Sequence, residues 1–251
     1  MKVVVIGGSG RIGSGVVTRL LAQGHQVISA SPSSGVDTLT GEGLAQAFDG
    51  AQVVVDVSNS PSFEDRAVLD FFRTATLNVV TAARAAGVQH LVVLSVAGTE
   101  RLLASGYFRA KLLQESLLQA SGLPFTIVRA TQFYEFIESI AGFSTQGDTV
   151  RLPSSSFQPI AAQDVSALVA AAAQEPPAGG IVEIAGPEAG PMALFVSRFL
   201  HRKGDPRTVV AAADAPYFGV AIEEDTLVPA GNPRRGVVRF EEWLRTVAAA
   251  Q

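Results

Sequence analysis

A tyrosine and a lysine stand four residues apart, at Tyr107 and Lys111, in a segment with a helical pattern. A helix places residues four apart on one face, so the phenol and the ammonium would be neighbours. A tyrosine has an ordinary pKa near 10, and a nearby ammonium favours the phenolate and lowers that pKa. Ser95 precedes Tyr107 and could donate a hydrogen bond to a substrate carbonyl. The three residues predict proton transfer at a carbonyl group; the alternative is a surface Tyr–Lys pair on an amphipathic helix.

A glycine-rich segment follows the first apolar run of the chain. Its glycines fit G-x-G-x-x-G through Gly8, Gly10 and Gly13, and G-x-x-G-x-x-G if Gly7 is read as the first. Glycine allows positive φ and a close approach to a pyrophosphate, and a following helix offers free N–H donors. Because a strand precedes this loop and a helix follows it, the pattern favours a dinucleotide site over a structural turn. The predicted contact residues are Gly7, Gly8, Ser9, Gly10, Arg11, Ile12 and Gly13.

The residues after the second apolar run favour NADP over NAD. NAD-binding proteins place an acidic residue about 20 residues beyond the loop, but residues 14–36 contain none. A 2′-phosphate could instead accept hydrogen bonds from serine hydroxyls, and Arg11 could neutralise it. Asp37 lies just beyond these serines and keeps NAD as the alternative. The predicted residues are Ser31, Ser33, Ser34 and Asp37.

The elements that must position these residues alternate along the first half of the chain. Apolar runs predict strands over 3–6, 26–30, 52–57, 90–96 and 125–129, and helical patterns cover 12–23, 43–48, 65–86 and 107–120. Strands that alternate with helices indicate a parallel sheet. An α/β fold with a doubly wound parallel sheet follows, since a closed barrel would need two more regular units. Ser95 would then lie at the carboxyl edge of the sheet, where ligands bind.

The regular alternation ends near residue 130, and prolines divide the second half into short pieces. We therefore expect a nucleotide-binding core over residues 1–130. Residues 131–251 are expected to form a smaller C-terminal substrate lobe packed on that core, with the site in the cleft between them. Strands are expected near 157–160 and 181–185.

Composition excludes several classes of protein. Charged residues are 17% of the chain and mean hydropathy is +0.29, which argues against disorder. The pI of about 5.4 argues against a nucleic-acid partner. No apolar run approaches the 18 to 20 residues of a membrane span, and the first apolar run is too short for a signal peptide. The chain has no cysteine, and its three histidines lack metal-ligand spacing. We expect a cytoplasmic protein, monomeric or homodimeric, with no metal.

The glycine loop, Ser95 and the Tyr107-x-x-x-Lys111 pair resemble the short-chain dehydrogenase/reductase superfamily, whose fold is of Rossmann type. The segments 129–133, 159–160 and 164–165 resemble its atypical, NmrA-like branch. The resemblance implies that Lys111 bonds the nicotinamide ribose and that Thr131 approaches the nicotinamide. It also implies that Ser58 and Asn59 lie along the cofactor, and that residues 131–133 approach the substrate. Asn78 is one candidate for the asparagine of the superfamily's proton relay.

Two functions are consistent with these residues. The first is an NAD(P)-dependent oxidoreductase that transfers hydride between NADP(H) and a small carbonyl or quinone-like substrate; an epimerase of sugar nucleotides is a minor option. The second is a regulator that senses NADP(H) without catalysis, as in some NmrA-like proteins. Aromatic side chains of the second half could line a substrate pocket, although aromatic residues at this density usually form core. The predicted substrate residues are Gln132, Phe133, Phe136 and Phe157; Tyr134 and Phe143 belong to the same aromatic group.

Overall fold

A seven-stranded sheet dominates the computed structural model, which describes residues 1–247 of the chain. The strand order is β12-β9-β5-β4-β3-β1-β2. The strands are β1 (Lys2–Ile6), β2 (Gln26–Ala30), β3 (Val53–Asp56), β4 (His90–Val96), β5 (Phe125–Ala130), β9 (Gly180–Ala185) and β12 (Arg234–Arg235). This open, parallel α/β sheet confirms the predicted fold class and excludes the closed barrel.

The strand order reverses beside β1, which has β2 on one side and β3 on the other. Both pairings are parallel, and Ile6 is in register with Ala30 and with Asp56. The carboxyl ends of these three strands are therefore level with one another. In open α/β sheets ligands bind at such a reversal point. The segments that follow β1, β2 and β3 are the glycine loop, the serine run and residues 57–59.

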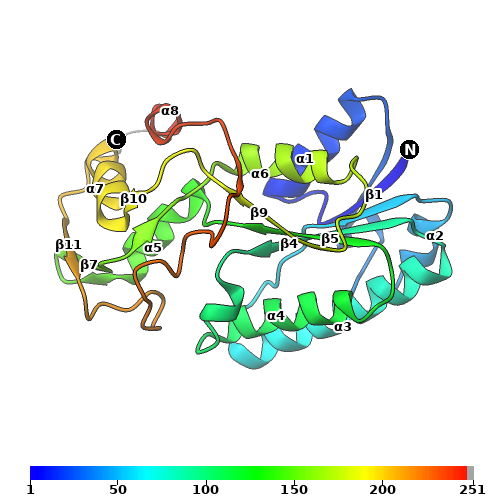
Figure 1. The fold of residues 1–251 in the computed structure, drawn as a ribbon, viewed down its shortest axis with the longest axis horizontal. Coiled ribbons are helices and arrows are strands. Elements are labelled where there is room, and N and C mark those ends of the chain that lie inside the picture. The colour runs from blue at the N-terminus through cyan, green and yellow to red at the C-terminus, as the bar shows by residue number, and fades with distance from the viewer. Residues whose placement is uncertain (248–251) are drawn as a thin grey trace. The chain divides into compact units, whose positions relative to one another are not determined.

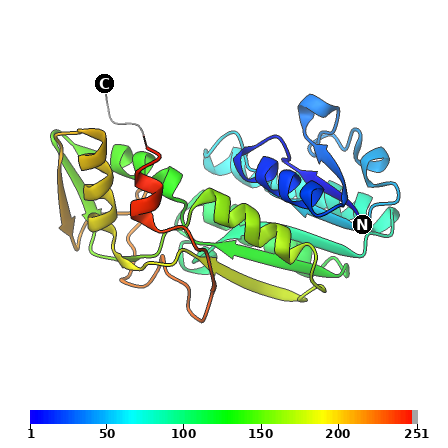
Figure 2. The ribbon, with the colours of Figure 1, turned by 90° about the horizontal axis from the view of Figure 1, so that it is seen from above.

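Helices cover both faces of the sheet (Figure 1). One face carries α3 (Asp65–Ala85) and α4 (Gly106–Gln119), and the other carries α1 (Arg11–Ala22) and α6 (Ala162–Ala172). Figure 2 shows α1 and α6 side by side, and the Ser166 hydroxyl donates a hydrogen bond to the Ile12 carbonyl at 3.0 Å. A short helix, α2 (Leu44–Phe48), completes the core around β1, β3 and β4. These β-branched strands are apolar on both faces because helices cover both faces.

The chain divides into two compact units. The first contains residues 1–129 and 165–182, and the second contains residues 130–164 and the chain from 183 onward. The end of the first segment lies next to the boundary expected at residue 130. The segment 165–182 belongs to the first unit rather than to the predicted C-terminal lobe, because α6 packs on α1.

The second unit has small sheets and an aromatic core. Its elements are α5 (Ile137–Phe143), β6 (Thr145–Gln146), β7 (Thr149–Pro153), β8 (Ser156–Phe157), β10 (Gly190–Pro191), α7 (Met192–Lys203), β11 (Thr208–Ala212) and α8 (Phe240–Leu244). The strands pair as β11-β7-β6 and β10-β8. Phe240 of α8 contacts the rings of Tyr134, Phe195 and Trp243. Asp164 accepts hydrogen bonds from the amides of Val237 and Val238, which ties the chain before α8 to this unit.

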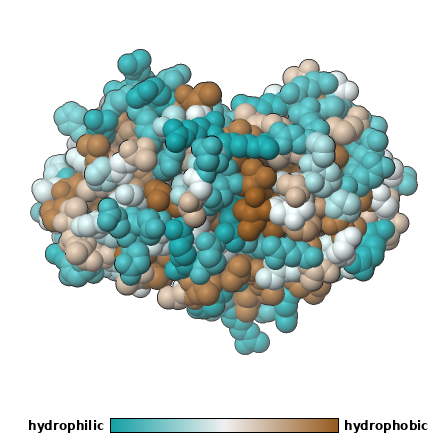
Figure 3. Space-filling model, in the orientation of Figure 1, coloured by the Kyte–Doolittle hydropathy of each residue, from teal (hydrophilic) through white to brown (hydrophobic). Residues whose placement is uncertain are grey.

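The surface drawn in Figure 3 mixes hydrophilic residues with small hydrophobic patches. Within residues 1–247, no helix has the length and apolar character needed to span a membrane. The same residues contain no group of histidine, aspartate and glutamate side chains arranged to hold a metal ion.

Candidate dinucleotide site

The glycine loop joins β1 to α1 at the reversal point of the sheet. Gly7 has φ +75°, a conformation that side chains with a Cβ rarely adopt. A Cβ on Gly8 would lie 2.5 Å from the Ser29 hydroxyl, and one on Gly13 would lie 2.1 Å from the Gly7 carbonyl oxygen. The chain therefore packs on itself too closely for any residue but glycine. This accounts for the spacing of the motif.

The first turn of α1 presents backbone donors to a ligand. Gly10 is the N-cap residue, and no side chain caps the helix. The first turn contains no acidic residue, so nothing there repels an anion. Free N–H groups and the positive end of the helix dipole make this terminus suitable for a pyrophosphate. Ser9 and Arg11 are exposed beside it, whereas the side chain of Ile12 is buried in the core.

The serine run after β2 forms a tight turn in which the hydroxyls bond to one another. Ser31 caps a short 3₁₀ helix, Pro32–Ser34, and the Ser34 hydroxyl in turn accepts from the Ser31 amide. The Ser31 and Ser33 hydroxyls lie 2.9 Å apart. Ser33 and Ser34 are exposed residues, but the Ser34 hydroxyl donates to the carbonyls of Ser29 and Ser31, so only the Ser33 hydroxyl is left for a phosphate.

Asp37 has a structural role in the next turn. One of its carboxylate oxygens accepts hydrogen bonds from the amides of Leu39 and Thr40. Asn78 on α3 donates to the carbonyls of Thr38 and Leu39, so its side chain holds this turn. The placement of Asn78 as a relay asparagine is therefore wrong. That prediction for Asn78 rested on residue type alone.

The turn after β3 lies against the glycine loop. A Cβ on Gly7 would meet the Ser58 amide nitrogen at 3.0 Å. The Ser58 amide and hydroxyl both donate to one oxygen of Asp56, at 2.9 and 2.6 Å. Asn59 is exposed at the end of this turn. Ser58 and Asn59 thus lie at the predicted edge of the sheet, but sequence reasoning missed the buried Asp56 that shapes their turn.

Asp56 is an unusual residue at the end of a buried strand, with a relative exposure of 3%. Burial raises the pKa of its carboxyl, while the hydrogen bonds from Ser58 and the charge of Lys111 act in the opposite direction. The sequence signal was an acidic residue directly after Val53-Val54-Val55, a run that otherwise contains only valine. Charged residues are almost never fully buried without a partner. An acidic residue within a buried-strand pattern therefore signals a carboxylate with a partner in the core.

Ser95 lies near the end of β4, as predicted, but its hydroxyl is engaged within the protein. It donates to the Glu115 carboxylate at 2.5 Å. Glu115 also pairs with Arg129 through two hydrogen bonds, of 3.0 and 2.7 Å. Arg129 bonds Glu100 as well, at 2.5 Å. The expected free donor for a substrate carbonyl is therefore a member of a buried ionic network that the sequence reading missed.

Tyr107 lies in the first turn of α4, and its ring packs among aromatic neighbours. The ring centroids of Phe63, Phe72 and Phe108 lie 5.5, 6.2 and 5.6 Å from its own. Burial raises the pKa of Tyr107 to about 12. The prediction that Lys111 lowers this pKa is therefore wrong, because desolvation in the aromatic cluster dominates.

Lys111 shares α4 with Tyr107, but its ammonium is bonded elsewhere. It donates to the Leu94 carbonyl at 2.8 Å and to the Gln114 side chain, and it lies 4.5 Å from the centre of the Phe72 ring. Burial lowers the pKa of Lys111 to about 8, against the opposing charges of Asp56 and Glu115. Ammonium has three donors, and Leu94 and Gln114 accept from two of them. In the structure, Lys111 thus interacts electrostatically with Asp56, and Ser95 forms a hydrogen bond with Glu115.

Two predicted residues of the second unit have buried polar atoms without partners. Thr131 is 1% exposed and Gln132 is 7% exposed. The Thr131 hydroxyl oxygen and both polar atoms of the Gln132 carboxamide have no hydrogen-bond partner within residues 1–247. Buried polar groups are almost always hydrogen-bonded, so each exception needs an explanation. A bound ligand or an ordered water molecule would satisfy these atoms.

The predicted aromatic pocket is only partly realised. Phe157 is fully buried against Phe195, with ring centroids 5.7 Å apart, so its prediction as a substrate residue is corrected to core. Tyr134 is fully buried as well, and its hydroxyl donates to the Val238 carbonyl. Phe133 is half-buried and pairs with the exposed Phe136 at 5.5 Å.

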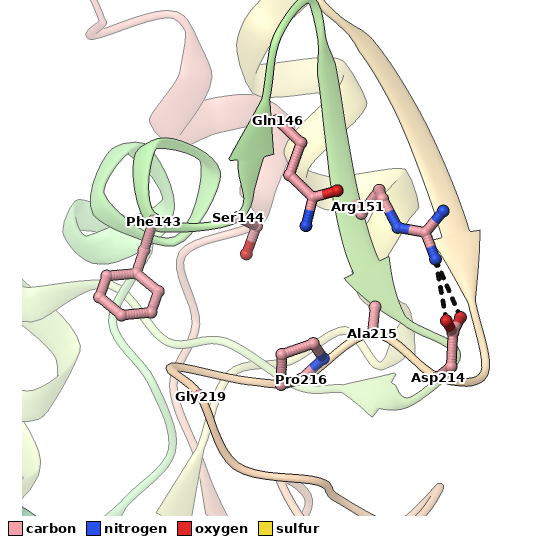
Figure 4. A pocket seen from close by; sticks show the side chains of 8 residues that line it. All are labelled: Phe143, Ser144, Gln146, Arg151, Asp214, Ala215, Pro216 and Gly219. Carbon is pink, nitrogen blue, oxygen red and sulfur yellow. Dashed lines mark hydrogen bonds and ion pairs between the residues drawn. The ribbon is translucent and has the colours of Figure 1, made fainter.

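A separate hollow of about 310 Å³ lies within the second unit (Figure 4). Arg151 and Asp214 form an ion pair on its wall, at 3.0 Å, and Phe143 projects from the end of α5 on the other side. Phe143 is its one contributor from the predicted aromatic group, and the predicted catalytic residues lie elsewhere. Its lining residues are Phe143, Ser144, Gln146, Arg151, Asp214, Ala215, Pro216 and Gly219.

Comparison with known proteins agrees with this geometry. The profile of a family described as NAD(P)H-binding matches residues 7–176. The photosystem II assembly factor Ycf39 of Trieres chinensis is 27% identical over 149 residues, covering 54% of this chain and 47% of that protein. The chain thus spans about half the length of the curated relatives it matches.

Two solved structures show the same fold. The UDP-glucose 4-epimerase of Thermus thermophilus, in complex with NAD, superposes with a TM-score of 0.71 at 21% identity, over 98% of this chain and 97% of that one. RMD of Pseudomonas aeruginosa, complexed with NADPH, superposes with a TM-score of 0.69 at 15% identity, over 97% and 96%.

Proposed function

Because the chain belongs to a family described as NAD(P)H-binding, we propose that it is an NADP(H)-dependent oxidoreductase of the short-chain dehydrogenase/reductase type, which reduces a small carbonyl or quinone-like substrate. The observation that carries this proposal is the glycine loop at the uncapped terminus of α1, at the reversal point of the sheet. The close packing at Gly8 and Gly13 fits a loop that admits a pyrophosphate. The proposed site residues of this loop are residues 7–13, with Ser58 and Asn59 beside it.

The residues after β2 support NADP rather than NAD. The exposed Arg11 has no ionic partner within residues 1–247, so its charge is available to a 2′-phosphate. The hydroxyl of the exposed Ser33 can donate a hydrogen bond of the kind a phosphate accepts. Asp37, the residue that would favour NAD, uses a carboxylate oxygen to hold its own turn.

In this mechanism the nicotinamide, when bound, supplies hydride to the carbonyl carbon. Tyr107 supplies the proton that the carbonyl oxygen takes up. A phenol with a pKa of about 12 is protonated at neutral pH, so it can act as a proton donor. Lys111 uses its third donor to hold the ribose. In the second unit, Thr131 and Gln132 have buried polar atoms that a bound ligand would satisfy.

Substitution of Tyr107 by phenylalanine tests this role. Loss of a general acid lowers turnover by about 10²- to 10⁴-fold. The substituted protein should therefore lose NADPH consumption with a panel of ketones, aldehydes and quinones. NADPH affinity should stay within a few-fold of the wild type, because the hydroxyl contacts no part of the loop. Unchanged turnover would refute Tyr107 as the acid.

A second function, a non-catalytic sensor of NADP(H), has its own supporting observation. The Ser95 hydroxyl is occupied by Glu115, and the Tyr107 ring is packed among aromatic side chains. A wild-type protein that consumes no NADPH with any member of the panel, yet binds NADP and NADPH with distinct affinities, would favour the sensor.

A further inference from the structure

A buried chain of polar groups connects α4 to the glycine loop. The Lys111 ammonium donates to the Gln114 side-chain oxygen, and the Gln114 nitrogen donates to Asp56 at 3.4 Å. The other Asp56 oxygen accepts both donors of Ser58, whose backbone touches Gly7. We call the set Lys111, Gln114, Asp56 and Ser58 the Asp56 chain.

The direction of hydrogen bonding in this chain is fixed by its charged ends. Ammonium only donates and carboxylate only accepts. The Gln114 carboxamide must therefore turn its oxygen to Lys111 and its nitrogen to Asp56. All three side chains are buried, with exposures of 2 to 3%. No salt bridge joins Lys111 directly to a carboxylate within residues 1–247, so Gln114 provides the hydrogen-bonded link between the two charges.

The turn after β3 takes its shape from Asp56. Val57 continues the pairing of β3 with β1 through its amide, which donates to the Ile6 carbonyl at 3.1 Å. Ser58 then bends back so that its amide and hydroxyl reach Asp56. Gly7 packs directly on this bend. A change in the turn would therefore displace the loop that holds the pyrophosphate.

We propose that Asp56 is a positioning residue of the dinucleotide site, which holds the turn after β3 against Gly7 and is itself held by Gln114 and Lys111. This inference rests on the proposed binding of NADP(H). It gives α4 a role in cofactor affinity that does not depend on acid–base chemistry. The proposal can be tested directly, because the carboxylate and the carboxamide can be exchanged between the two positions.

The exchange uses Asp56→Asn, Gln114→Glu and the double substitution. In Asp56→Asn, the new amide nitrogen faces the Gln114 nitrogen, so two donors meet. In Gln114→Glu, two buried carboxylates meet. In the double variant, the carboxylate at position 114 accepts from both Lys111 and the amide at position 56, whose oxygen still accepts from Ser58. The hydrogen bonds of the chain are then complete again.

NADPH affinity, measured by calorimetric titration, is the readout. We expect each single variant to bind NADPH about tenfold more weakly, and the double variant to return to within about threefold of the wild type. Gln114→Leu, which cuts the link and leaves Asp56 in place, should also weaken binding. Thermal unfolding checks that each variant is folded.

A matched control separates positioning from general destabilisation. Thr126 is a buried residue at the opposite end of the sheet, and its hydroxyl bonds His90 and the Ala178 amide. Thr126→Val should lower the melting temperature but leave NADPH affinity within about twofold. Wild-type affinity in Asp56→Asn, or a double variant no tighter than the weaker single one, would overturn the inference alone. A wild type that binds no dinucleotide would overturn the proposed function as well.

Discussion

Gln132 carries a carboxamide whose oxygen and nitrogen are both buried and unpaired within residues 1–247. Leaving a buried polar group unsatisfied costs about 1–3 kcal/mol. A protein retains such a residue at a net cost unless a ligand or an ordered water molecule completes its hydrogen bonds. Gln132 and the neighbouring Thr131 are therefore the residues of the second unit that point most directly to a bound molecule.

Gln132→Met tests this reading, since methionine has nearly the same shape and no strong hydrogen-bonding group. Without ligand, we expect the variant to be more stable by about 1 kcal/mol. This corresponds to a rise of about 2–4 °C in the melting temperature of a chain of this size. In the presence of the cofactor and an accepted substrate, ligand-induced stabilisation should be smaller than in the wild type. A variant less stable than the wild type in the absence of ligand would contradict the account.

The buried ammonium of Lys111 makes a prediction about pH. Its pKa is about 8 in the folded protein and 10.5 in the unfolded chain. Between these values the unfolded chain binds more protons than the folded protein, so stability should rise with pH across this window. The gain attributable to Lys111 is about 3 kcal/mol at most. Urea unfolding at pH 7.5, 9 and 10.5 should show the rise in the wild type, and Lys111→Met should reduce it. Equal slopes in the two proteins would exclude a depressed pKa.

The sequence predicted which elements carry the candidate residues, but not the partners of their side chains. The spacing of Tyr107 and Lys111 correctly places both on one helix. Their pKa values depend on burial and on contacts with residues such as Phe72 and Gln114, which lie outside the motif. Ser95 was expected to be a free donor, but its partner Glu115 gives no local sequence signal. Only packing shows these interactions.

Helix α4 and strand β5 are joined by the ion pair between Glu115 and Arg129. Both side chains are buried, with exposures of 2% and 10%. Removing one partner of such a pair leaves the other charge buried and costs about 3–5 kcal/mol. The pair therefore fixes the helix that carries Tyr107 and Lys111 against the sheet.

Arg129→Met should accordingly destabilise the protein by about 3–5 kcal/mol, measured by chemical unfolding. Arg73→Met is the matched control, because Arg73 pairs with Asp70 on the surface of α3, with exposures of 58% and 50%. Exposed pairs contribute only about 0–1 kcal/mol. Equal effects of the two substitutions would show that the buried pair does not hold α4.

Elements were more predictable than side-chain networks. The expected strands over 26–30 and 90–96 match β2 and β4. β4 is buried over most of its length, as a largely apolar run predicts, whereas β2 lies at the edge of the sheet and only Ala30 is buried. The helix expected over 65–86 matches α3 within one residue. The return of 165–182 to the first unit could not be predicted, since it depends on the packing of α6 on α1. Phe157, which was expected to line the aromatic pocket, lies in the core instead.

At the scale of the whole molecule, the first unit contains the glycine loop, the serine turn and the Asp56 chain, and the second contains Thr131 and Gln132. The first unit therefore contains the proposed pyrophosphate and 2′-phosphate contacts. Binding of a dinucleotide is the claim on which both the oxidoreductase and the sensor proposals depend.

Calorimetric titration of the wild type with NADPH, NADP, NADH and NAD tests that claim most directly. We predict that the wild type binds these dinucleotides, with the 2′-phosphorylated forms bound more tightly. Gly13→Ala should abolish it, because the added Cβ would lie 2.1 Å from the Gly7 carbonyl oxygen. Gly142→Ala is the control, since nothing lies within 4 Å of a Cβ there, and it should bind as the wild type does. A wild type that binds none of the four dinucleotides, or a Gly13→Ala variant that binds them normally, would contradict the account.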